Sequence, residues 1–327
     1  MKKIISLLVT ILFLALTACS APTDHRTAND KVEAPKVQQT AKSEKTTTPL
    51  PAQNLSNGTK TPESNQNKQI TDSAKTLKIH FIDVGQADSS LIVFPNGKAL
   101  LIDAGNNVDG QNIVNYIKKQ GIARLEAVVG SHPHADHLGG IDTVINNLDI
   151  GSVYMPKVTS NTKTFEDVLK AIKAKNLKVT TAAAGVKLDI DPDVRTEMLA
   201  PNNSKYDDLN NYSAIIKLTY GQTSFLMEAD AQEVSEKEML AKGYDLKSSA
   251  IRLGHHGSHS SSSPAFISAV SPSFGIISCG TGNDYGHPHK ETLSTLAKAN
   301  VKVYRTDLNG TIVSISDGTN ITFRTSK

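Results

Sequence analysis

The sequence predicts a mixed α/β (α+β) domain over residues 77–327, with two β-sheets and helices on their outer faces. The first observation is that hairpins alternate with strand–helix units in both halves of this region. Hairpins mixed with such units favour two sheets over one parallel sheet. The second observation is that short apolar strands lead directly into three histidine-rich segments. Loops that follow such strands gather at one sheet edge, where they can form a site.

The first half of the domain opens with a strand and a hairpin, whose turn is the Pro-Asn-Gly sequence at 95–97. The last helix of this half is predicted from apolar residues at i, i+3, i+4 and i+7 counted from Phe165, a spacing that is typical of an amphipathic helix. The predicted strands are 77–84, 89–94, 98–103 and 125–130, and the predicted helices are 111–120, 139–148 and 165–175.

The second half repeats this alternation. One hairpin turns at Gly221 and Gln222, and a closing hairpin over 310–325 turns at Asp317 and Gly318. The other predicted strands and helices alternate along the chain. The strands are 214–220, 223–228, 250–253, 274–278 and 301–305, and the helices are 231–242, 264–270 and 290–300.

Residues 1–19 are typical of a bacterial lipoprotein signal peptide. Two lysines precede an almost wholly apolar run over 4–16, which is too short to span a bilayer comfortably. The run ends in Leu-Thr-Ala-Cys, which resembles the lipobox, where the chain is cut before the cysteine and the thiol is acylated. The alternative is an ordinary signal peptide with a chance cysteine. Lipid on Cys19 predicts a mature protein anchored to the extracytoplasmic face of the cell membrane.

Residues 20–76 are predicted to form a disordered tether. The segment has no aromatic residue and is rich in Thr, Lys, Gln, Asn, Ser and Pro. Such a composition cannot bury enough apolar surface to offset the entropy of the chain. The segment would act as a flexible spacer between the membrane and the domain.

The charge balance argues against a protein that grips duplex DNA. The 327 residues carry 35 Lys and Arg against 32 Asp and Glu, a formal net charge of +3. Residues 1–76 hold 10 of the basic and 6 of the acidic side chains, which leaves 25 against 26, or −1, for the domain. Proteins that contact many duplex phosphates show a basic excess. A nucleic-acid substrate would therefore have to be held locally.

The strongest chemical signal is a histidine cluster. Eight of the 10 histidines fall in the three segments that follow predicted strands, and the first reads His-Pro-His-Ala-Asp-His over 132–137. His132 and His134 can point to one side of an extended loop, while Asp136 and His137 enter a helix and can aim at a second point. Imidazole and carboxylate suit zinc and manganese. A surface loop that binds metal adventitiously would not explain the aspartate or the Gly-Gly pair that follows.

The pattern His-x-His-x-Asp-His is the hallmark of the metallo-β-lactamase superfamily, which this sequence resembles. Further segments resemble the hydrolase domain of ComEC-type DNA-uptake proteins, and the likeness covers essentially all of 77–327. The resemblance implies a four-layer αββα sandwich, a binuclear site for two divalent ions, Zn or Mn, and hydrolysis, often of phosphodiesters. The matching segments are 81–89, 132–137, 255–258 and 285–288.

The resemblance assigns His132 and His134 to one metal and Asp136 and His137 to the other. It makes Asp230 the bridging carboxylate, although an N-cap for the helix after it is a competing role. Two histidines follow the strand at 250–253. One would complete the ligand set of the second metal, and the other would face substrate. The choice between those two residues, His255 and His256, stays open.

The sequence departs from many superfamily members, because no histidine lies between His137 and His255. The segment 210–213 resembles what the uptake-type branch carries there, and makes Asn210 and Ser213 candidate partners of the ligands. Asp83 and Asp88 are candidates for orienting the histidines, or else form a polar turn. Asp103 is expected to be a structural turn residue.

The predicted function is an extracytoplasmic metal-dependent hydrolase, with phosphodiesterase or nuclease-like activity as the first choice. Asp136, His255 and His256 would act at the metals, and His287 is a candidate proton donor to the leaving group. The alternatives are a phosphocholine-type cell-wall esterase and a catalytically weak binding lipoprotein that keeps the fold.

The expected partners are the membrane surface, through lipid on Cys19, and DNA or a cell-wall phosphoester. The sequence gives no sign of an obligate protein partner. No membrane-spanning run follows residue 19. The chain is therefore expected to be a stand-alone relative of the uptake channel.

Overall fold

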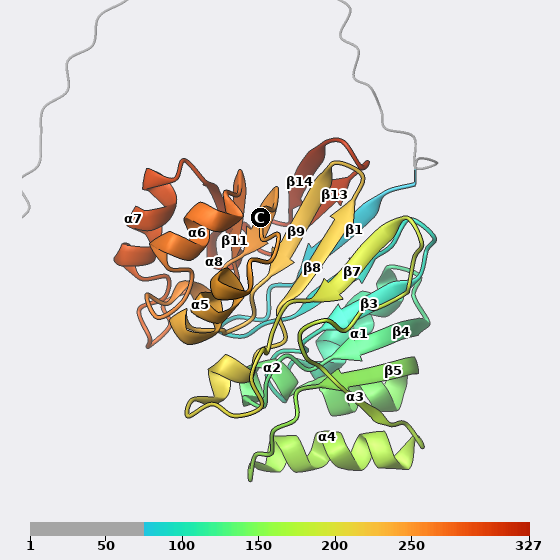
Figure 1. Ribbon diagram of the computed structural model, residues 1–327. Helices are drawn as coiled ribbons and strands as arrows, with labels where there is room; N and C mark the ends of the chain where they lie inside the picture. Colours follow the sequence, from blue (N-terminus) through green and yellow to red (C-terminus); the bar gives the residue numbers. More distant parts are fainter. Residues whose placement is uncertain (1–74) are drawn as a thin grey trace, which may run out of the picture. The chain divides into compact units, whose positions relative to one another are not determined.

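The computed structural model of the protein describes residues 75–327, and these form two β-sheets packed face to face with helices outside (Figure 1). This is the αββα sandwich that the sequence predicted, so the expected fold class is confirmed. The predicted signal peptide, Cys19 and nearly all of the predicted tether lie outside the described residues. No helix within 75–327 is both long and apolar enough to cross a membrane.

The larger sheet has eight strands in the order β14-β13-β1-β2-β3-β4-β5-β6. Pairing is antiparallel from β14 to β3 and parallel from β3 to β6. The first strand lies between β2 and the late strand β13, with Ile79 opposite Ser314. The strands are β1 Leu77–Phe81, β2 Ser90–Val93, β3 Ala99–Ile102, β4 Arg124–Val129, β5 Asp149–Met155, β6 Val179–Thr181, β13 Ile312–Ser316 and β14 Ile321–Thr325.

The smaller sheet has six strands in the order β12-β11-β10-β9-β8-β7. Here β7, β8 and β9 are antiparallel and β9 to β12 are parallel. Both sheets therefore combine hairpins with parallel strand–helix units. The strands are β7 Val194–Met198, β8 Ile216–Tyr220, β9 Thr223–Met227, β10 Ala250–Arg252, β11 Phe274–Ile277 and β12 Lys302–Arg305.

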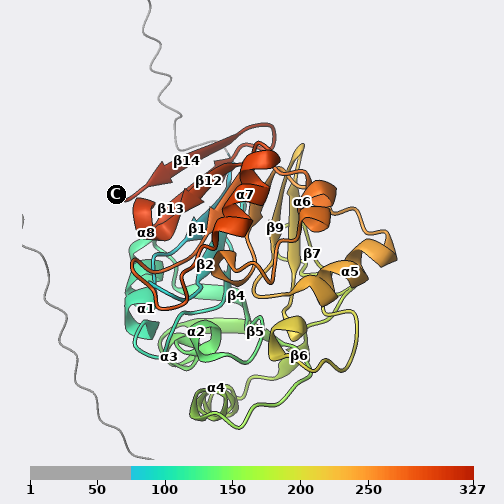
Figure 2. The same cartoon turned by 90° about the vertical axis from the view of Figure 1, so that its left-hand side faces the viewer.

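The helices cover the outer faces of the two sheets, which Figure 2 shows from the side. Helices α1, α3 and α4 lie against the larger sheet, and α5, α6 and α7 against the smaller one. Two short 3₁₀-helices, η1 Leu209–Tyr212 and η2 His255–Gly257, lie in loops. The α-helices are α1 Gly110–Lys119, α2 Ala135–Leu138, α3 Ile141–Asn147, α4 Lys163–Ala174, α5 Glu233–Lys242, α6 Pro264–Val270, α7 Lys290–Lys298 and α8 Thr306–Asn309.

Three apolar clusters separate these layers. The central one lies between the sheets and includes Phe81 and Phe225, one from each sheet. A second packs the larger sheet on its helices through residues such as Leu101 and Ile113, and a third does the same for the smaller sheet. Burial of this apolar surface is the main source of stability for such a layered domain.

The parallel strands position the site, because their carboxyl ends meet at one side of each sheet. In such sheets, ligands bind outside the carboxyl ends of the strands. The segments after β3, β4, β9, β10 and β11 carry Asp103, the cluster at 132–137, Asp230, the pair at 255–256 and His287. The fold therefore brings the three histidine-rich segments to one place.

Candidate metal centre

The first histidine segment is held against the neighbouring loop by two glycines. A Cβ on Gly139 would lie 2.2 Å from backbone atoms of Asn106 and Asn107, and a Cβ on Gly140 would lie 2.4 Å from the carbonyl oxygen of Ala104. Neither position tolerates a side chain without moving the backbone. The Gly-Gly pair therefore lets the short helix α2, with Asp136 and His137, dock on the loop after β3.

Four side chains from three loops converge on one point. His137 Nε2 lies 3.8 Å from Asp136 Oδ2 and 3.2 Å from Asp230 Oδ2. His256 Nε2 lies 3.1 Å from Asp136 Oδ2 and 3.7 Å from Asp230 Oδ2. Four ligand atoms that each lie about 2.0 Å from a tetrahedral ion are about 3.3 Å apart. These four atoms are therefore spaced as the ligands of one metal ion.

The other ring nitrogen of each histidine fixes the tautomer. His137 Nδ1 lies 2.9 Å from Asp103 Oδ2, and His256 Nδ1 lies 3.0 Å from the carbonyl oxygen of Ser278. Both partners only accept hydrogen bonds, so each Nδ1 carries the proton and each Nε2 lone pair faces the convergence point. His137 Nε2 is also a buried atom without a hydrogen-bond partner among the described residues. This arrangement fits a cation.

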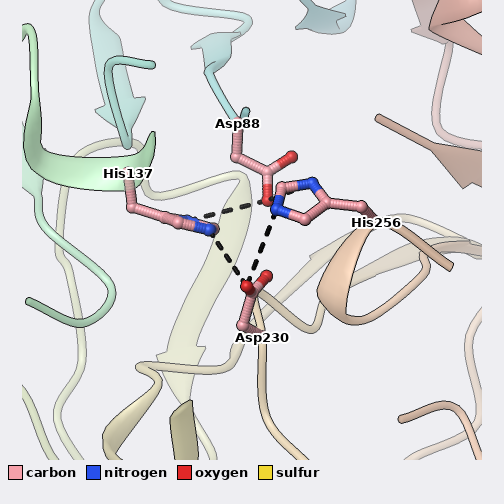
Figure 3. Close-up of side chains that lie close together, drawn as sticks. All are labelled: Asp88, His137, Asp230 and His256. Carbon is pink, nitrogen blue, oxygen red and sulfur yellow. Dashed lines mark ion pairs between the residues drawn. The ribbon is translucent and has the colours of Figure 1, made fainter. Parts of the chain in front are cut away.

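Asp88 lies beside the same rings but on their other side. Figure 3 shows it with His137, Asp230 and His256, which together form a group that could hold a metal. Asp88 Oδ2 is 3.7 Å from His137 Nδ1 and 4.0 Å from His256 Nδ1, and it forms a buried ion pair with Arg252. Burial lowers the pKa of Arg252 to about 9, which still leaves it charged at neutral pH. Asp136, which faces both Nε2 atoms, therefore fits the ligand position better than Asp88.

A second group of atoms lies next to the first. His132 Nε2 is 3.0 Å from His134 Nδ1 and 3.9 Å from Asp230 Oδ2. Asp230 Oδ2 therefore faces both groups, as a bridging carboxylate must. The competing role as a helix cap does not apply, because α5 begins at Glu233 and its N-cap position is Gln232.

The buried charges of the site perturb one another. Burial alone would lower the pKa of His137, but the carboxylates of Asp230, Asp136 and Asp103 outweigh burial and raise the pKa well above its usual value. Burial would raise the pKa of Asp230, but His137 and His256 hold it well below its usual value. Burial and the charge of His137 lower the pKa of His132. The carboxylates of the site thus stabilise positive charge at its centre, where a bound cation would take the place of the proton on His137.

A cavity of about 340 Å³ opens onto the two groups. Both histidines line the cavity, but His256 Nε2 lies near both Asp136 and Asp230, whereas the side chain of His255 is 26% exposed and its Nε2 lies 3.8 Å from Asp230 Oδ2. The geometry therefore separates the two histidines that the sequence left open. The cavity is lined by Gln86, His134, Ala135, Asp136, Asp230, His255, His256, Tyr285 and His287.

His287 lies in the cavity wall as a neutral ring. Burial, together with His256 and His255, lowers its pKa to about 4. Gln86 Oε1 accepts a hydrogen bond from the Gly280 amide, so its Nε2 donates to His287 Nδ1 over 3.2 Å. With Nδ1 as acceptor, the proton of His287 must be on Nε2.

One assignment from the sequence needs correction, that of Asp83, and the structure adds detail to the others. Asp83 does not orient the histidines, because its carboxylate accepts from the Gly85 amide and from Lys327 Nζ. Asn210 has a buried Oδ1 without a hydrogen-bond partner among the described residues, whereas Ser213 Oγ does accept from the Asp230 amide. Asp103 has the left-handed φ of a turn residue, +59°, but it also binds His137.

Sequence reasoning missed several residues that support the site. Ser131 donates through its amide and hydroxyl to Asp103, and Arg252 pairs with Asp88. One signal was present in the sequence: an arginine inside the apolar strand Ala-Ile-Arg-Leu needs a buried partner. The role of the Ser278 carbonyl has no side-chain signature, because any residue supplies it.

Comparison with known proteins agrees with this geometry. Residues 82–281 match the family described as the metallo-beta-lactamase superfamily. The chain is 27% identical over 252 residues to ComE operon protein 3 of Bacillus subtilis, covering 72% of this chain and 32% of that protein. It is 31% identical over 232 residues to competence protein ComA of Neisseria gonorrhoeae, covering 70% and 31%.

The chain therefore belongs to the metallo-β-lactamase superfamily. The expected similarity to competence proteins is confirmed, although the chain spans only about a third of the length of these relatives. Among solved structures, the metallo-beta-lactamase fold protein YhfI of Bacillus subtilis aligns with a TM-score of 0.49 and 12% identity, covering 71% of this chain and 96% of that one.

Proposed function

We propose that this protein is a two-metal phosphodiesterase with nuclease-like activity, anchored by lipid at the extracytoplasmic face of the cell membrane. The observation that carries the proposal is the pair of ligand groups that share Asp230 Oδ2. Two cations held by one bridging carboxylate form the usual arrangement for displacement at phosphorus. A catalytically weak binding protein would have no need to keep both groups.

The residues present fit two divalent ions, Zn or Mn. His137, His256, Asp136 and Asp230 would hold one ion, and His132, His134 and Asp230 the other. When bound, the two metal ions would supply Lewis acidity and a nucleophile formed from water near neutral pH. The second ion would have three protein ligands, one fewer than the first, which would leave more of its surface open to substrate.

The chain supplies orientation and hydrogen bonding around the reacting group. Asp103 and Ser278 hold the rings of His137 and His256. His287 is neutral at pH 7, so it acts through its Nε2–H as a hydrogen-bond donor to the leaving-group oxygen. This role differs from donation by a charged imidazolium, which the lowered pKa makes scarce.

A phosphodiester is favoured as substrate by the similarity to competence proteins. The net charge of −1 over 77–327 argues against a firm grip on a duplex. A phosphocholine-type cell-wall ester is the alternative, since the same metals would act on its diester. A β-lactam is disfavoured because the resemblance points to the other branch of the superfamily.

The proposed location rests on Cys19 and the lipobox-like run before it. Replacing Cys19 with Ala removes the thiol that would be acylated. The variant should appear in the medium or stay unprocessed, as judged by fractionation and the mass of the mature chain. Mature Cys19→Ala protein that still partitions into detergent would contradict lipid anchoring.

Hydrolysis of bis-p-nitrophenyl phosphate with and without added Zn or Mn tests the activity. The wild-type protein should turn it over only with metal. Asp136→Ala should abolish turnover and lower the bound metal measured by mass spectrometry, while circular dichroism stays unchanged. Asp83→Ala is the matched control and should keep both metal and activity. Full activity in Asp136→Ala would rule out the proposed site.

A further inference from the structure

The outer wall of the catalytic cavity carries an exposed aromatic face. Tyr285 lines the cavity and is 69% exposed, which makes it one of the most exposed large apolar side chains within 75–327. Its ring is stacked on His287, with centroids 5.6 Å apart and an interplanar angle of 20°. One face of the phenol ring therefore lies on His287, and the other is free.

The loop that carries Tyr285 is firmly held. Asn283 Nδ2 donates to the carbonyl oxygens of Gly280 and His287, and Asn283 Oδ1 accepts from the His287 amide. His289 Nε2 donates to the carbonyl oxygen of Tyr285, while His289 Nδ1 accepts from the amide of His259. The backbone that carries the exposed ring is thus held in place before any ligand binds, which lowers the entropic cost of binding on it.

We propose that Tyr285 is a stacking platform for the base next to the scissile phosphate, so that the preferred substrate is single-stranded nucleic acid. The inference rests on the proposed phosphodiesterase function and specifies its substrate class. Aromatic rings on which successive bases stack are, together with positive charge that holds the phosphates, the common device for binding unpaired strands. A duplex keeps its bases stacked inside and offers none to Tyr285.

The geometry favours a flat base over a choline group. Two rings stacked nearly parallel present a single flat face, which matches a base. Quaternary ammonium groups are recognised by aromatic walls on several sides. Within 75–327 no other aromatic residue besides the histidines lines this cavity, so such a cage is missing.

The test uses the full-length protein and a short abasic DNA strand that carries one 2-aminopurine. Stacking on Tyr285 should quench the 2-aminopurine fluorescence immediately after mixing, before turnover matters. Tyr285→Ala should lose this quenching and weaken binding about tenfold or more, while Tyr285→Phe should keep both. Leu308→Ala, at a 63% exposed position outside the cavity, is the matched control and should behave as wild type.

The same variants separate the possible outcomes. Tyr285→Ala should raise KM for oligonucleotides and have no added effect on a fully abasic strand. An equal loss on base-bearing and abasic strands would overturn the stacking role. Competition by phosphocholine that depends on Tyr285, without base-dependent quenching, would also overturn it in favour of a choline site. Tyr285-dependent quenching without metal-dependent cleavage of any diester would instead refute the phosphodiesterase function and leave the stacking platform standing.

Discussion

Asp103 shows how one residue can serve both the backbone and the chemistry. Its φ of +59° turns the chain after β3, and its carboxylate reaches His137 Nδ1 and the amide and hydroxyl of Ser131. The turn places the carboxylate, and the carboxylate orients a predicted metal ligand. Removing the charge should therefore affect metal binding more than folding.

Asp103→Asn tests this role. The amide oxygen can still accept a hydrogen bond, but the neutral group makes His137 a weaker ligand, so metal affinity should fall about 10- to 100-fold. Competition with a chelating dye measures the affinity, and urea unfolding checks that stability changes little. Asp83→Asn, which changes a carboxylate without contact to the histidines, should leave the affinity unchanged. Equal affinities for the Asp103→Asn variant and wild type would contradict the orienting role.

His80 should make stability depend on pH for a reason unrelated to the metals. It is buried in β1, with Nδ1 2.8 Å from the Tyr116 hydroxyl, and burial, with Lys78, lowers its pKa to about 4. Between pH 6.5 and 4 the unfolded chain binds a proton that the folded chain does not. The free energy of unfolding should therefore fall with pH across this window, by at most about 3 kcal/mol, and level off below it.

Urea unfolding at several pH values between 6.5 and 4 measures this effect. His80→Gln keeps a polar group near Tyr116 but cannot take up a proton, so its stability should fall less steeply than that of wild type. The other titrating groups are the same in both proteins and cancel in the comparison. Parallel curves for the two proteins would show that His80 does not carry the effect.

Helix α2 is the element on which the ligand geometry depends. Gly139→Ala would force a Cβ into the backbone at 106–107 and shift the helix that carries Asp136 and His137. We expect a loss of about 1–3 kcal/mol in unfolding free energy and a clear drop in metal affinity. Gly243→Ala is the control, because nothing lies within 4 Å of its Cβ and only the left-handed φ of +67° is strained. Its cost of about 1 kcal/mol should leave metal affinity intact.

At the level of elements, strands and helices with an unbroken apolar pattern could be predicted from the sequence. The helix at 264–270 begins and ends where predicted, and the hairpins at β2–β3 and β8–β9 are confirmed. The strands β5, β6 and β7 were missed. Gly151 and Ser152 interrupt the apolar pattern of β5, and all three residues of β6 are exposed, so only pairing with neighbours makes them strands.

In the candidate site, too, the residues with a local sequence pattern could be predicted, and those defined by distant contacts could not. The cluster at 132–137 could be found because its members are contiguous in the sequence, and Asp230 because it follows a strand. The choice between His255 and His256 depends on which ring meets Asp136. Both residues lie in one tight turn, with left-handed φ values of +49° and +55°. Their contacts are set by the distant segments that the fold brings together, and adjacent sequence does not encode them.

For the whole molecule, the boundary near Leu77 should be visible to a protease. Lys75 is tied to the domain, because its carbonyl oxygen accepts from the Tyr220 hydroxyl. The composition of 20–76 offers no apolar anchors, so limited proteolysis should cut there first and leave a resistant fragment that begins near Leu77. Mass spectrometry of the products identifies the cut sites. Equal resistance of both regions would place the boundary elsewhere.

The pairing of β1 with β13 determines when the domain can fold. Ile79 and Ser314 lie side by side in the larger sheet although 235 positions separate them. Such a distant contact forms slowly, because a long loop must close before the contact stabilises anything. While the chain is being synthesised, β1 lacks one of its two neighbours until nearly all of the domain has been made. The larger sheet therefore cannot be completed before translation of the domain is nearly finished.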